Sequence, residues 1–226
     1  MASTLYPVLT RAEQGSERFQ RNAGLLLQGV IWSTVPGAAL IALAASDVVA
    51  LLYGQKWLDV VPLLGLAAAA VSFIGINHAA YNLLLANCEQ SRCLRLDIVS
   101  AVIGFGVAFA LIPWGAAAYM AGLTVHGAIM LALNLKALIE TKGIDHGSTI
   151  AAVVPPLVAV ALAVAVVVSV LGTVSQIDSA IVRLGMVGVL FCATYAAALR
   201  GLFARQTALL VEVAPGGQLV RRLLHL

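Results

Sequence analysis

Charged side chains are scarce in this chain of 226 residues: Asp, Glu, Lys and Arg together make up 10% of it, whereas a soluble domain carries about 25%. Hydrophobic residues make up 62%, and the mean hydropathy is +1.00. This balance excludes a water-soluble globular fold. It also excludes an intrinsically disordered chain, which needs low hydrophobicity and high charge. The composition predicts an all-α fold, a polytopic integral membrane bundle.

Motifs for catalysis and metal binding are also missing. The cysteines are Cys88, Cys93 and Cys192, and the first two have neither a second pair nor a nearby histidine. No serine stands in a Gly-x-Ser-x-Gly setting, and no His-Glu-x-x-His motif occurs. The net charge of +3 is too small to favour nucleic acid. The sequence therefore predicts no enzyme, no metal site, no cofactor and no nucleic-acid partner.

Six apolar stretches are predicted to span the bilayer: residues 23–45, 60–86, 98–113, 116–135, 150–174 and 181–199. Most reach the roughly 20 residues that a helix needs to cross the hydrocarbon. Arg183 stands near the start of the last stretch, and the apolar cores otherwise contain no Asp, Glu, Lys or Arg. Because ion-driven carriers use a buried ionisable group, this absence argues against a self-contained ion-coupled mechanism. The bundle is assigned to residues 1–201, with a cytoplasmic segment at 1–22.

The distribution of lysine and arginine predicts the orientation. Six spans place both termini and the loops after spans two and four on one side of the membrane. That side holds Arg11, Arg18, Arg21, Arg92, Arg95, Lys136, Lys142, Arg200, Arg205, Arg221 and Arg222. The other side holds only Lys56 and Arg183, and it includes an outward loop at 47–57. The positive-inside rule then predicts that both termini are cytoplasmic. Residues 202–226 form a cytoplasmic tail, either interfacial or solvated.

Four motifs follow one another along the first 140 residues. They are Leu5-Tyr6-Pro7-Val8-Leu9-Thr10-Arg11, the run Val48–Gly54 followed by Trp57, the turn Leu84-Leu85-Ala86-Asn87, and Pro113-Trp114-Gly115-Ala116-Ala117. Their order and spacing resemble those of polysaccharide repeat-unit flippases (Wzx type) of the multidrug/oligosaccharidyl-lipid/polysaccharide superfamily. The last motif lacks the family's second glycine.

The resemblance implies an identity for the bundle. It would correspond to helices nine to fourteen of a transporter of 12–14 helices, hence to one of two lobes. The implied function is flipping of a polyprenyl-diphosphate-linked oligosaccharide across a bacterial inner membrane, together with a separate N-terminal lobe or a second copy of the chain. The alternative is a membrane scaffold that does not transport and binds lipid or partner proteins.

Polar residues within the spans are candidates for lining a sugar pathway. His78 and Asn82 share one face of the second span with Gly75, at positions i+3 and i+7. The other candidates are Gln28 and Trp32 in the first span and His126 in the fourth. Amides and imidazoles hydrogen-bond saccharide hydroxyls, but the same side chains also join helices to one another. The sequence leaves both interpretations open.

Three further features carry a structural and a functional interpretation. Pro36 with Gly37 predicts a kink in the first span, either a packing kink or a hinge. Ser100 and Gly104 belong to a small-residue face that predicts close helix contact. Candidate contacts to phosphate or lipid headgroups are Arg18, Arg21, Arg92 and Arg95. Topology alone also accounts for these arginines.

Overall fold

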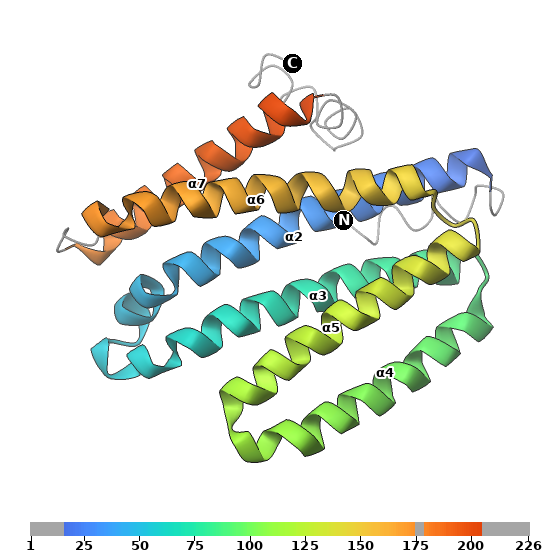
Figure 1. Ribbon diagram of the computed structural model, residues 1–226, viewed down its shortest axis with the longest axis horizontal. Helices are drawn as coiled ribbons and strands as arrows, with labels where there is room; N and C mark the ends of the chain where they lie inside the picture. The colour runs from blue at the N-terminus through green and yellow to red at the C-terminus, as the bar shows by residue number, and fades with distance from the viewer. Residues whose placement is uncertain (1–15, 175–178, 205–226) are drawn as a thin grey trace.

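The computed structural model describes residues 16–174 and 179–204 (Figure 1). The elements are α2 (Glu17–Leu52), η1 (Gln55–Val60), α3 (Val61–Ala86), α4 (Gln90–Leu111), η2 (Ile112–Trp114), α5 (Ala116–Glu140), α6 (His146–Val174) and α7 (Ala180–Leu202). No strand occurs within this part of the chain. Six helical segments are long and apolar enough to cross a membrane, which confirms the predicted all-α fold with six spans. The motif at residues 5–11 and residues 205–226 of the predicted tail lie outside the described residues.

The helices extend beyond the apolar runs that predicted them. At 1.5 Å per residue, the 36 residues of α2 measure about 54 Å, whereas the hydrocarbon is about 30 Å thick. Because α2 continues to Leu52, residues 47–52 are helical, and the predicted outer loop at 47–57 is in large part wrong. Likewise α4 begins at Gln90, so Arg92, Arg95 and Asp97 are part of a spanning helix. Apolar runs mark only the hydrocarbon portion of each helix.

Local sequence signals set several helix ends. The hydroxyl oxygen of Ser16 accepts a hydrogen bond from the Phe19 N–H at 3.2 Å and caps α2. The turns after α2 and before α5 each contain a glycine with positive φ, Gly54 at 85° and Gly115 at 94°. These φ angles are in the left-handed region, which L-amino acids rarely adopt, so both turns depend on glycine.

Asp145 caps the start of α6. Its carboxylate accepts hydrogen bonds from the Ser148 N–H, at 3.1 Å, and from the Ser148 hydroxyl. The hydrogen bond from the hydroxyl stabilises the charged carboxylate and lowers the pKa of Asp145, against a smaller opposing effect of burial.

The long helix α2 lies at the centre of the bundle and contacts α3, α6 and α7 (Figure 1). One buried cluster joins α2, α3 and α5 around side chains such as Leu27, Leu84 and Leu138, and it also includes one buried residue each of α4 and α6. A second cluster, centred on Phe191, joins α6, α7 and α2. The α3–α4–α5 unit and the α6–α7 pair therefore meet mainly through α2.

Pro36 lies inside α2, and the helix continues through it. Proline has no N–H, so the carbonyl of Trp32, four residues earlier, loses its usual partner within the helix. The hydroxyl of Tyr195 on α7 donates a hydrogen bond to this carbonyl at 3.0 Å. A polar contact between two helices thus replaces the hydrogen bond that proline removes. Whether Pro36 and Gly37 also act as a hinge stays a prediction.

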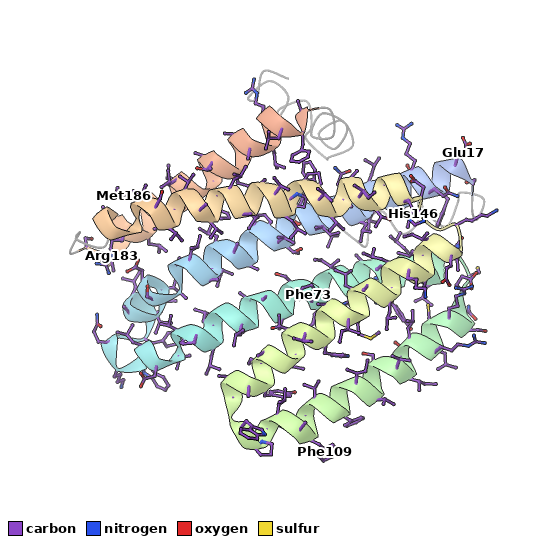
Figure 2. The ribbon with its side chains drawn as sticks, viewed as in Figure 1. Glu17, Phe73, Phe109, His146, Arg183 and Met186 are labelled. Atoms are coloured by element: carbon purple, nitrogen blue, oxygen red, sulfur yellow. The ribbon has the colours of Figure 1, made fainter. Side chains whose placement is uncertain are left out.

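Helix α4 is the least enclosed of the six spans. Cys93 is its one buried residue, and apolar side chains such as Val102 and Phe109 are exposed along its outer face. Figure 2 shows Phe109 pointing away from the bundle. In a membrane protein such a face contacts lipid.

The two ends of the bundle carry different charge. Helix direction alternates, so the start of α2 and the loops after α3 and α5 lie at one end, and Figure 2 shows Glu17 and His146 there and Arg183 at the other. At the end with Arg183, the guanidinium of this residue forms a half-buried ion pair with Asp47 of α2, with 2.6 Å between the Arg183 Nη2 and the Asp47 Oδ1. The end with Glu17 carries most of the described basic residues, and we refer to it as the basic end. The positive-inside rule predicts that the basic end faces the cytoplasm.

Candidate functional site

A cavity of about 430 Å³ lies between α3, α4 and α5. Its polar lining comes from Asn77, His78, Tyr81, Asp97, Ser100, His126 and Asn134. The remaining lining is apolar and includes Ile74, Leu123 and Met130. This volume is within the range of about 300–1,000 Å³ for small-molecule sites, and so is the mixture of apolar walls with a few polar groups.

Two asparagines form a hydrogen-bonded chain in the cavity wall. The Asn134 Nδ2 on α5 donates to the Asn77 Oδ1 on α3 at 2.9 Å, and the Asn77 Nδ2 donates to the carbonyl of Gly127 at 2.9 Å. At Gly127 a Cβ would stand 2.6 Å from the Cβ of Phe73, so α3 and α5 approach closely here. Figure 2 shows Phe73 on α3 beside α5. The close approach allows short asparagine side chains to bridge the two helices.

His126 of α5 faces α4 across the cavity. Its Nε2 lies 3.2 Å from the Ser100 hydroxyl oxygen, and a Cβ on Gly104 would be 3.7 Å from its Cε1. The small-residue face of α4 therefore contacts α5 as predicted. The small side chains leave room for the imidazole, which lines the cavity as well as joining the helices.

A carboxylate lies at the wall that α3 and α4 share. The hydroxyl of Tyr81 donates to the Asp97 Oδ2 at 2.9 Å. Asp97 is the one acidic residue of the lining, and no lysine or arginine belongs to the lining within the described residues. The cavity therefore combines a carboxylate, two amides, two imidazoles and two hydroxyls.

An ion-pair cluster joins α4 and α5 at the basic end. The Arg92 Nη1 lies 2.7 Å from the Glu140 Oε2, and its Nε lies 3.5 Å from the Glu89 Oε2. Lys136 is 3.9 Å from the other oxygen of Glu140. Arg92 precedes Asp97 by about 1.4 helical turns, so this cluster is near the part of the cavity that Asp97 lines.

The predicted groove residues separate into two groups. His78 and His126 line the cavity. Asn82 is exposed on α3 outside it. Gln28 and Trp32 are on α2, and their Nε2 and Nε1 atoms are buried without a hydrogen-bond partner in the described part of the chain. The structure does not bring these three residues to the cavity.

The predicted phosphate contacts are all on helices that reach the basic end. Arg21 is exposed near the start of α2, and Arg18 is in the first turn of that helix. Arg95 is exposed on α4, whereas Arg92 already pairs with two glutamates. These positions are consistent with either interpretation of the arginines.

Sequence reasoning missed five of the seven polar lining residues as pathway candidates. Asn77 and Tyr81 are separated by four residues on one face of α3, a signal that was available from the sequence. Asp97 immediately precedes the predicted third span, so it is not among the residues expected within the membrane. The sequence indicates only a packing role for Ser100. In the described residues, no cluster of three or more His, Cys, Asp or Glu could hold a metal ion.

Part of the chain is similar in sequence to a bacterial membrane protein. The chain is 27% identical over 130 residues to a protein of Klebsiella pneumoniae described as an uncharacterized membrane protein in the cps region. The matched segment is 58% of this chain and 26% of the relative, so it spans about a quarter of that protein's length. No family model matches the chain, and no solved structure matches it significantly.

Proposed function

We propose that this chain is one lobe of a membrane transporter for lipid-linked oligosaccharides, a repeat-unit flippase of the Wzx type. The observation that carries the proposal is the cavity of about 430 Å³ with seven polar side chains inside a membrane bundle. Polar groups in hydrocarbon are costly, so a concentration of them around one cavity favours a polar ligand. The similarity to a membrane protein of a cps region supports a role connected with capsule polysaccharide.

The chemistry of the cavity suits a saccharide. Amide, imidazole, hydroxyl and carboxylate groups can satisfy sugar hydroxyls that would otherwise lose their hydrogen bonds to water. The prenyl tail of such a substrate would stay in lipid beside the exposed apolar face of α4. Alternating access would come from rocking of this lobe against a second one, supplied by a separate chain or another copy.

Two alternatives are set aside in this proposal. The absence of catalytic motifs in the sequence favours transport over an intramembrane enzyme. A scaffold that binds lipid or partner proteins has no need of a polar cavity in its bundle, although it would fit the exposed face of α4. The export assay below distinguishes the scaffold from the transporter.

The test is export of repeat units in cells that lack their own flippase, with this chain expressed alone and together with a candidate N-terminal lobe. We expect His78→Ala and His126→Ala to reduce surface polysaccharide at least fivefold. Lipid-linked repeat units should accumulate at the cytoplasmic face. Asn82→Ala is the matched control, because Asn82 is a polar residue of α3 that lies outside the cavity.

Membrane content and thermal unfolding of each variant must be measured in parallel. Equal loss of export and of folded protein would assign the two histidines to packing. Normal export by correctly folded histidine variants would contradict the proposed pathway. No export by the folded wild-type chain, alone or with the N-terminal lobe, would favour the scaffold.

A further inference from the structure

Asn134 has a hydrogen-bond acceptor that no described residue of the protein satisfies. The side chain lines the cavity and is 4% exposed. Its Nδ2 donates to Asn77, whereas its Oδ1 is buried and has no partner within the described residues. A buried acceptor without a donor is unfavourable, and an exception of this kind in a native fold calls for an explanation.

The orientation of the Asn134 amide is fixed by its neighbours. The Asn77 Nδ2 donates to the carbonyl of Gly127, so the Asn77 Oδ1 is the atom that faces Asn134. Rotating the Asn134 amide by 180° would place two carbonyl oxygens against each other. The unpartnered atom is therefore the acceptor oxygen, and its partner must be a donor.

The charge of the cavity also favours a ligand that donates hydrogen bonds. Asp97 contributes a carboxylate whose Oδ2 accepts from Tyr81, and a carboxylate offers lone pairs on both oxygens. No lysine or arginine lines the cavity in the described part of the chain. Arg92, on the same helix as Asp97, pairs with Glu140 at 2.7 Å outside the lining. The cavity offers acceptors and negative charge, with no permanent positive charge to balance an anion.

We infer that this cavity selects neutral or amino-bearing saccharides and rejects acidic ones, with the Asn134 Oδ1 accepting a ligand hydroxyl or amine hydrogen and Asp97 repelling a ligand carboxylate. The inference rests on the proposed function and narrows its substrate class. A uronate beside Asp97 places two like charges close together, whereas an ammonium gains from the same carboxylate. This selectivity applies to the sugar in the cavity.

The test measures binding of three disaccharides of similar size to the full chain in nanodiscs of neutral phospholipid. The probes are chitobiose, which is neutral, the glucosamine disaccharide, which is cationic, and digalacturonate, which is anionic. We expect digalacturonate to bind at least tenfold more weakly than the other two. Asp97→Asn should bring its Kd to within threefold of the chitobiose value and remove any advantage of the cationic probe.

Asn134→Leu removes the acceptor at nearly constant volume and should weaken binding of chitobiose about tenfold. Asn82→Leu is the matched control, since it makes the same change on α3 outside the cavity and should leave binding unaltered. If Asn134→Leu does not fold, Asp97→Asn alone decides, because it keeps the shape of the side chain.

Three results would overturn the inference: equal binding of the three probes to the wild type, unchanged discrimination in Asp97→Asn, or no binding of any probe. Equal binding would leave glycan recognition in place and remove only the selectivity. With no binding, export in cells decides the proposed function independently, since that assay uses the natural lipid-linked substrate.

Discussion

The hydrogen bond between Tyr195 and the carbonyl of Trp32 gives a sharp test of how α2 tolerates its proline. Tyr195→Phe removes the hydroxyl and keeps the ring, which stacks parallel to Phe191 with centroids 6.3 Å apart. Because Pro36 provides no N–H, the carbonyl then has no donor from its own helix. An unsatisfied buried polar group costs about 1–3 kcal/mol, and interhelical hydrogen bonds in membranes average about 0.6 kcal/mol with a maximum of about 1.7. We expect a loss of about 1–2 kcal/mol.

The assay is a double-mutant cycle on the free energy of unfolding in mixed micelles. Pro36→Ala restores the N–H that can bond to the carbonyl of Trp32, so Tyr195→Phe in this background should cost less than about 0.5 kcal/mol. The coupling between the two substitutions should therefore be about 1 kcal/mol. Tyr53→Phe, at the exposed end of α2, is the control and should be neutral. An equal cost of Tyr195→Phe in both backgrounds would refute the reasoning.

Three more predictions follow from contacts described above. Gly127→Ala places a methyl group against a phenylalanine of α3 and should cost about 1–3 kcal/mol in an unfolding titration. Gly106→Ala is the control, because the space around Gly106 is open, and it should not destabilise the protein. Equal effects of the two substitutions would contradict the close packing of α3 and α5. Asp47→Asn should cost about 1–2 kcal/mol by the same measurement, and adding Arg183→Gln should recover part of that loss. A double variant less stable than Asp47→Asn alone would count against the ion pair. Asp145→Ala should cost about 1 kcal/mol at neutral pH. Because the folded-state pKa of Asp145 is lowered, its contribution is present above the unfolded pKa of about 3.9 and is lost as the pH falls through the folded value, so the difference between variant and wild type should vanish in acid; a difference that persists there would contradict the capping role.

The number of spanning helices could be predicted from the sequence, because bilayer thickness imposes a minimum apolar length on each span. The contact of Ser100 and Gly104 with a neighbouring helix was predicted for a similar reason, since small side chains allow close approach. Helix ends were less predictable. Helices continue beyond the apolar runs, so charged residues such as Asp97 are part of them.

The cavity could be predicted only in part. His78 and His126 were found because an imidazole within an apolar run is conspicuous. Asn82 was selected by its spacing from His78, but the position of α5 determines which face of α3 is enclosed, and that depends on contacts distant in sequence. The pairing of Asn77 with Asn134 spans 57 residues, and helical periodicity carries no information on such a pair.

The exposure of α4 has a consequence for how this protein should be handled. With Cys93 as its one buried residue, α4 is held in place by polar and apolar contacts on its inner side and by the surrounding acyl chains on its outer side. Lipid is thus part of what defines the position of this helix. Harsh, short-chain detergents would remove that support and release α4 before the remaining helices separate, so bilayer mimetics of native thickness are the appropriate medium for preserving the architecture of the protein.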